Sequence, residues 1–172
     1  MAAFAATPSS STGRRPLLAA AASRTRYDAI FLDAYRQPYI PFYLVTREFF
    51  ASVRAHLRAG GTIIINVGHI PGSSSLERVV SATLHAVFPY VMRDRVSNTN
   101  SLVVGSTEPL SGERLGAAAS RSQLPVELDA VAANVVGDFG PALGGGVVYT
   151  DDRAPVEWLT DLSILGYATG GR

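Results

Sequence analysis

Residues 26–68 read RYDAIFLDAYRQPYIPFYLVTREFFASVRAHLRAGGTIIINVG and contain two apolar runs with a proline loop and an amphipathic segment between them. The first run, 27–34, carries an acid near each end and is typical of a strand buried on both faces. The second run, 62–68, is rich in β-branched residues and predicts another buried strand. Between the runs, apolar side chains recur at helical spacing after Thr46, a residue suited to the N-cap. The pair Gly60–Gly61 is expected to end this helix.

A second helix and two short strands follow this unit. Residues 73–90 have a helical apolar pattern with serines at the start and Pro89 near the end. Two segments, 91–96 and 100–107, flank a tight turn and are predicted to pair in antiparallel orientation. The order strand, helix, strand, helix and hairpin predicts a partial doubly wound, Rossmann-like α/β sheet with parallel strands and a C-terminal antiparallel hairpin. Ligands of such sheets bind outside the carboxyl ends of the parallel strands.

The chain divides into three regions by composition. Residues 1–25 form an Ala-, Ser- and Arg-rich tail without an acid, which we expect to be poorly ordered or to form one short helix. The same composition is typical of an organelle transit peptide. Residues 26–108 hold the α/β unit. Residues 109–172 form a helical and glycine-rich extension, predicted to end in a helix that Asp151 or Asp152 caps.

The composition argues against several function classes. The 15 Lys and Arg residues nearly balance the 14 Asp and Glu residues, so the charge does not predict binding to nucleic acid or to an acidic membrane. No apolar segment reaches the roughly 20 residues that a membrane-spanning helix needs. There is no Cys, and the three His residues lack metal-ligand spacing, so no metal site is predicted. We expect a cytoplasmic protein, or an organellar one if residues 1–25 act as a transit peptide.

Two polar residues mark the predicted ligand edge of the sheet. Asp33 follows the first strand, where its carboxylate could accept a proton, bind a cationic amine or simply cap a turn. Asn66 lies near the end of the second strand. Between them along the chain, the loop 35–43 holds three tyrosines, a phenylalanine and two prolines. These rings could wall a pocket or only shield the core.

Residues 26–68 resemble the central stretch of the spermidine synthase-like family, in which a strand ends in Asp, a proline-bearing loop follows, T-x-E-F opens a helix and Leu-x-x-Gly-Gly precedes the next strand. The segment YTDDRAPVEWL, at 149–159, is similar to the usual C-terminal segment of that family. The resemblance implies a class I methyltransferase fold and a polyamine aminopropyltransferase activity. Such an enzyme transfers an aminopropyl group from decarboxylated S-adenosylmethionine, a co-substrate that is not tightly bound, to a diamine such as putrescine.

The resemblance also implies a role for each candidate site residue. Asp33 would be the catalytic base, because the attacking amine must lose a proton before it forms a bond to carbon. The implied donor contacts are Asp33, Ala34 and Gly13. The implied contacts to the small-molecule amine acceptor are Tyr35, Gln37, Tyr39 and Asn66.

The sequence departs from the family pattern in three places. Arg36 and Gln37 stand where a second acid is usual, and Asn66 stands near the place of a usual Gln, so the acceptor is expected to differ from putrescine. No glycine-rich donor loop precedes residue 27. We therefore expect a truncated form in which the first strands of the sheet are missing and donor binding is poor.

An open strand edge would favour a homodimer or a partner chain. Two alternatives to aminopropyl transfer remain open at this point. One is a methyltransferase-like protein that uses S-adenosylmethionine itself, and the other is a non-catalytic remnant or interaction module.

Overall fold

The computed structural model describes residues 25–33, 41–122, 125–155, 161–162, 164–166 and 168. Its described strands form a five-stranded sheet with the order β1-β2-β4-β3-β5. The strands are β1 (Tyr27–Leu32), β2 (Leu57–Gly68), β3 (Tyr90–Asp94), β4 (Asn100–Ser106) and β5 (Gly140–Pro141). The helical elements are the short 3-10 turn η1 (Phe42–Leu44) and the α-helices α2 (Arg47–Ala55), α3 (Ser75–His85), α4 (Gly112–Arg121) and α5 (Val126–Asp138).

The sheet combines parallel and antiparallel pairing. β1 lies parallel to β2, and β4 lies antiparallel to both β2 and β3. The helix α2 connects the two parallel strands, as the sequence predicts. The mixed, partial Rossmann-like sheet and its antiparallel hairpin are therefore confirmed. Within the described residues β1 pairs only with β2, so its other edge has no described neighbour.

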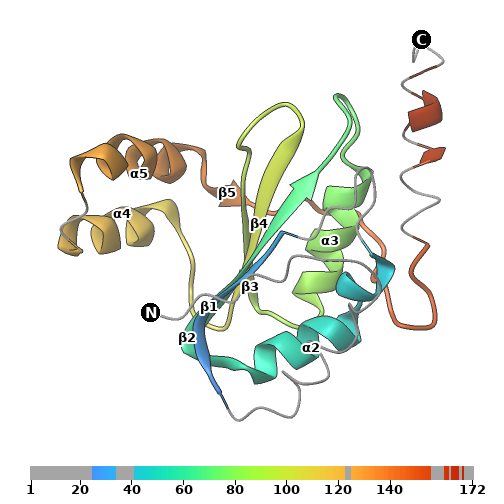
Figure 1. The fold of residues 1–172 in the computed structure, drawn as a ribbon, viewed down its shortest axis with the longest axis horizontal. Coiled ribbons are helices and arrows are strands. Elements are labelled where there is room, and N and C mark those ends of the chain that lie inside the picture. Colours follow the sequence, from blue (N-terminus) through green and yellow to red (C-terminus); the bar gives the residue numbers. More distant parts are fainter. Residues whose placement is uncertain are drawn as a thin grey trace.

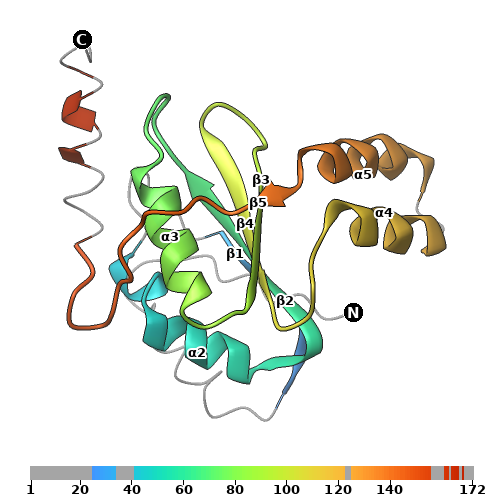
Figure 2. The same ribbon diagram turned by 180° about the vertical axis from the view of Figure 1, so that it is seen from behind.

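The hydrophobic core lies on one face of the sheet. Side chains alternate along β2, so that Ile63, Ile65 and Val67 are buried while the residues between them are half-buried. The buried side chains pack in one cluster with residues of α2 and α3. Figures 1 and 2 show these two helices on one side of the sheet and the pair α4 and α5 on the other.

The prediction that the first strand is buried on both faces is wrong. Leu32 is buried, but Asp28, Ala29 and Phe31 of β1 are exposed, and the Phe31 side chain keeps 38% of its accessible surface. The physical reason is that α2 and α3 cover one face, and no described helix covers the other face at β1 (Figures 1 and 2).

The Gly60–Gly61 pair does not end a helix, as the sequence suggested, but belongs to a strand. α2 already ends at Ala55, and β2 begins at Leu57. Gly60 has a φ of 73°, a conformation that favours glycine. A Cβ atom on Gly61 would lie 3.0 Å from the carbonyl oxygen of Arg58 and 3.1 Å from that of Tyr27. The two glycines therefore permit the irregular register at the start of the β1–β2 pair.

Thr46 caps α2 as predicted and also holds the C-terminal segment. Its hydroxyl oxygen accepts a hydrogen bond from the backbone N–H of Phe49 at 3.2 Å and donates one to Asp151 Oδ1 at 2.7 Å. The backbone N–H of Asp151 donates to Glu48 Oε2 at 3.0 Å. Asp151 therefore contacts the start of α2. Part of the helix predicted after it, residues 156–160, lies outside the described residues.

The next predicted helix is shorter than expected. α3 ends at His85, four residues before Pro89, and Ala86 is its C-cap. Ser74 is the N-cap, but its hydroxyl accepts a bond from Arg78 Nε at 3.1 Å and forms no capping bond. A buried carboxylate in the first turn, Glu77, instead joins this helix to the sheet, because it contacts Arg93 of β3 at 3.0 Å and accepts a bond from Ser101 of β4.

The extension contains the helices α4 and α5, which pack against each other. None of the helices in the described part of the chain has the length and hydropathy that a membrane span requires.

We predict that Thr46→Ala lowers the free energy of unfolding by about 2 kcal/mol, because both the capping bond and the bond to Asp151 are lost at a buried position. Urea denaturation measures this change. The matched control is Ser111→Ala, which removes a capping bond to Arg114 N–H on the exposed helix α4 and should cost about 1 kcal/mol or less. Equal losses in the two variants would contradict a stabilising contact between Thr46 and Asp151.

Candidate functional site

Asp33 and Asn66 meet at one edge of the sheet. β1 and β2 are parallel, and Leu32 pairs with Ile65, so the next residue of each strand lies at the same level. Asn66 Nδ2 donates a hydrogen bond to Asp33 Oδ1 at 3.1 Å. The structure thus brings together two residues that the sequence placed at the expected ligand edge.

A third residue, Asn100, extends this contact. It begins β4, which runs antiparallel beside β2. Asn100 Nδ2 donates to Asn66 Oδ1 at 2.8 Å. Because the amide oxygen of Asn66 accepts from Asn100, its NH₂ group is turned toward the carboxylate of Asp33. Asn100, Asn66 and Asp33 therefore form a chain of side-chain hydrogen bonds, which we call the amide relay.

Sequence reasoning did not select Asn100. The hairpin pattern predicted that segment 100–107 pairs with segment 91–96, and the structure confirms this pairing. However, the second neighbour of β4 is β2, and this strand order brings Asn100 to Asn66. The only sign of Asn100 in the sequence was that a polar residue begins the second strand of the hairpin.

The carboxylate of Asp33 is open to a ligand. Asp33 is exposed, and its carboxylate forms no ion pair with the described residues. The bond from Asn66 holds one of its two oxygens. A solvent-facing carboxylate oriented by an amide can attract a cationic amine or accept a proton from one.

The aromatic loop is described only at its end. Ala34, Tyr35, Gln37 and Tyr39 lie outside the described residues, as does Gly13. Phe42 and Tyr43 are described, and their rings meet edge to face with centroids 5.6 Å apart. Tyr43 packs against the core, whereas the Phe42 side chain keeps 41% of its surface exposed.

The loop after β2 is tied to the hairpin. The backbone N–H of His69 donates to the carbonyl oxygen of Thr99 at 2.7 Å. His69 follows the relay residue Asn66 by three positions, and Thr99 directly precedes the relay residue Asn100. In the described ranges, no group of three or more His, Asp or Glu residues is arranged to hold a metal ion.

The resemblance to aminopropyltransferases is supported by one curated relative. No protein-family model matches the chain. A probable polyamine aminopropyl transferase of Bifidobacterium longum is 37% identical over 95 residues. These residues make up 54% of this chain and 21% of the relative. The resemblance is therefore confirmed over about half of the chain, which corresponds to about a fifth of the relative's length.

Two solved structures are similar in outline. A probable spermidine synthase from Corynebacterium glutamicum is 22% identical, with a TM-score of 0.49, and the match covers 86% of this chain and 48% of that protein. Human methyltransferase-like protein 13, solved in complex with SAH, is 20% identical, with a TM-score of 0.48, and the match covers 74% of this chain and 55% of that protein. The assignment of the fold rests on the observed strand order.

We predict that the amide relay is energetically coupled. In a double-mutant cycle, Asn66→Ala and Asn100→Ala should show a coupling free energy of about 0.5–1 kcal/mol, because each single change already breaks their shared hydrogen bond. Urea denaturation of the four proteins measures it. The control pairs Asn66→Ala with Asn98→Ala, an exposed residue whose side chain accepts a bond from Arg95. That pair should be additive, and additivity in the first pair would contradict the relay.

Proposed function

We propose that this chain carries the acceptor side of a polyamine aminopropyltransferase-like site, with Asp33 as the general base. The observation that supports this most directly is the carboxylate of Asp33 at the carboxyl end of a parallel strand, held by Asn66 at 3.1 Å. The chain is 37% identical over 95 residues to a probable polyamine aminopropyl transferase, which supports the same reaction class.

The proposed reaction forms one bond and breaks another. The diamine arrives as an ammonium ion, and Asp33 removes one proton so that the nitrogen carries a free electron pair. This nitrogen attacks the carbon next to the sulfonium of decarboxylated S-adenosylmethionine. A carbon–nitrogen bond forms, the carbon–sulfur bond breaks, and its electrons convert the sulfonium into a neutral thioether.

The amide relay gives Asn66 a positioning role. Its amide oxygen is engaged by Asn100 and one N–H is engaged by Asp33, so both ends of the side chain already have partners. Asn66 would therefore orient the base more than it binds the amine. The proposed acceptor contacts from Tyr35, Gln37 and Tyr39, and the donor contacts from Ala34 and Gly13, remain predictions of the family resemblance.

A second candidate is a non-catalytic interaction module. The observation that favours it is the β1 edge, which has no described neighbour, next to the exposed Phe31 ring. Such an edge can pair with a strand of another chain. The two candidates differ in one measurable property, because only the enzyme must bind an aminopropyl donor.

Calorimetry of the full chain with decarboxylated S-adenosylmethionine, S-adenosylmethionine and putrescine separates these candidates. We expect weak but saturable binding of the decarboxylated donor, and product that mass spectrometry detects. Preferred binding of S-adenosylmethionine would favour a methyltransferase-like protein. If neither donor binds, the interaction module is the better description of this chain.

We predict that Asp33→Asn lowers kcat by at least about 100-fold, because the amide cannot accept the proton of the amine. The matched control is Asp28→Asn at the start of β1, where an exposed carboxylate pairs with Arg58 at 2.6 Å and faces no predicted ligand. This control should keep kcat within about twofold, since an exposed pair contributes little. Near-normal turnover by Asp33→Asn would refute the assigned base.

A further inference from the structure

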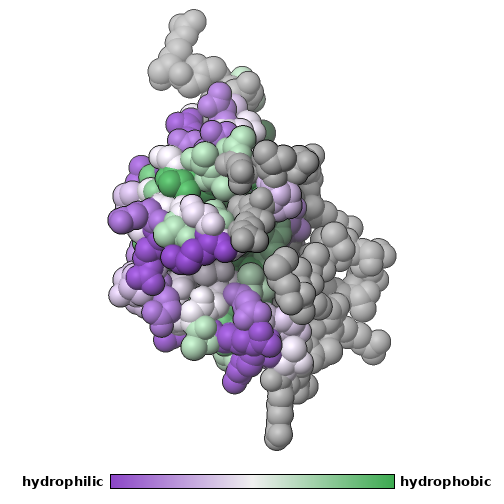
Figure 3. All heavy atoms as spheres, turned by 90° about the vertical axis from the view of Figure 1, so that its left-hand side faces the viewer, coloured by the Kyte–Doolittle hydropathy of each residue, from purple (hydrophilic) through white to green (hydrophobic). Residues whose placement is uncertain are grey.

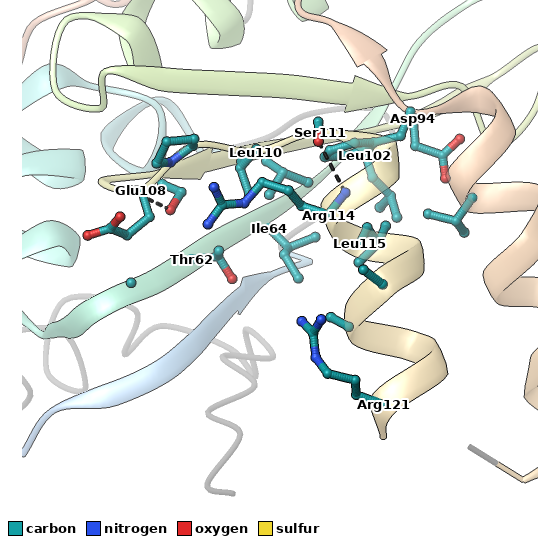
Figure 4. A pocket seen from close by; sticks show the side chains of 18 residues that line it. Thr62, Ile64, Asp94, Leu102, Glu108, Leu110, Ser111, Arg114, Leu115 and Arg121 are labelled. Carbon is teal, nitrogen blue, oxygen red and sulfur yellow. Dashed lines mark hydrogen bonds between the residues drawn. The ribbon is translucent and has the colours of Figure 1, made fainter. Parts of the chain in front are cut away.

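A cavity of about 750 Å³ lies on the side of the sheet opposite α2 and α3. β2 and β4 supply one wall, and the helix α4 supplies another (Figure 4). Thr62 and Ser106, which pair across these strands, line it at the end of the sheet that is opposite Asn66 and Asn100. The cavity extends along the sheet as far as Leu102, the cross-strand partner of Asn66, but none of the three relay side chains lines it, and no step of the proposed reaction uses it.

The floor of the cavity is apolar. Ile64 and Val104 are cross-strand partners, and Leu102 lies two residues before Val104 on the same face of β4. All three are only half-buried, because this face lacks the helical cover of the other face. On the facing helix, Leu115 keeps 39% of its surface exposed. The protein itself covers these side chains only in part. An apolar ligand could therefore pack against their exposed surface.

Two arginines of α4 line the same cavity. Arg114 and Arg121 are seven residues apart, which places them two turns apart on one face of the helix. Figure 4 shows both side chains leaving α4 toward the strand β2. Neither guanidinium has a hydrogen-bond or ion-pair partner among the residues that the structure describes, whereas Arg58 and Arg93 pair with acids.

The acids at the cavity do not neutralise these arginines. Asp94 lines the wall but is 94% buried and forms no ion pair with either arginine; burial, with a smaller effect of Asp138, raises the pKa of its carboxyl. Glu108 is exposed at the far end, where its side chain lies next to Gly60. The cavity therefore combines an apolar floor with two cationic groups that form no ion pair with any residue the structure describes.

We propose that this cavity binds an amphipathic carboxylate, whose apolar chain covers Ile64, Leu102 and Val104 and whose anionic head bonds to Arg114 and Arg121. A guanidinium offers parallel N–H donors that match the two oxygens of a carboxylate. The volume falls within the range of about 300–1,000 Å³ that is usual for small-molecule sites. The outer surface on the side where α4 and α5 lie mixes hydrophobic and hydrophilic residues (Figure 3).

The test is calorimetric titration of the full chain with dodecanoate below its micelle concentration. We expect saturable binding of one molecule per chain, and binding of dodecyltrimethylammonium at least about tenfold weaker because its head group is a cation. Arg114→Gln and Arg121→Gln should each weaken dodecanoate binding about tenfold. Arg95→Gln is the matched control, because Arg95 is exposed and is not one of the residues that line the cavity, and it should change the affinity less than twofold.

A second variant tests the apolar part of the site. Ala118 lines the cavity from α4 and is exposed, so Ala118→Trp should fill the cavity and abolish binding while circular dichroism and the thermal midpoint show an intact fold. Asp33→Asn should leave dodecanoate binding unchanged, which separates this site from the proposed reaction. The proposal is overturned if dodecanoate does not bind saturably, if the cationic amphiphile binds equally well, or if both arginine variants keep full affinity. Sedimentation that shows a dimer which Ala118→Trp dissociates would assign this face to self-association instead.

Discussion

The parallel pairing of β1 with β2 is the interaction on which the rest of the structure depends. It joins β1 and β2 through one crossover that contains α2, and it sets the face that α2 and α3 bury. It also places Asp33 beside Asn66, although these residues are 33 positions apart. A Cβ atom at Gly61 would lie 3.0–3.2 Å from three backbone oxygens, so any other residue there would crowd the start of the β1–β2 pair. Close packing at this glycine therefore supports the pairing on which the core and the candidate site depend.

The features that the sequence predicted well are local ones. The cap at Thr46 depends on the next three residues, and the antiparallel hairpin depends on the short turn between its strands. The features that it missed depend on distant elements. Asn100 reaches Asn66 only because β4 inserts between β2 and β3, and exposure of Phe31 depends on which helices cover the sheet. The Gly60–Gly61 pair was misread because glycines both end helices and permit irregular strands.

The two ends of the sheet differ in chemistry. At the carboxyl ends of β1 and β2, a single exposed carboxylate is oriented by two amides, and this arrangement suits a cation. On the face opposite the core, from Leu102 beside Asn66 toward the other end of the sheet, Arg114 and Arg121 border an apolar floor, and this arrangement suits an anion. The net charge of +1 therefore gives no indication of the two proposed sites, which differ in the charge of the ligand they would bind.

The bond between Thr46 and Asp151 joins positions that are 105 residues apart. In the same segment, the backbone N–H of Tyr149 donates a hydrogen bond to the hydroxyl oxygen of Thr83. The carbonyl oxygen of Tyr149 accepts one from the backbone N–H of Arg47. During synthesis, α2 and α3 emerge from the ribosome long before these partners exist. Thr46 and Thr83 have local hydrogen bonds within their own helices, to Phe49 and Val79, but their bonds to residues 149–151 can form only after that segment is made, so the fold is completed late and through contacts of high sequence separation.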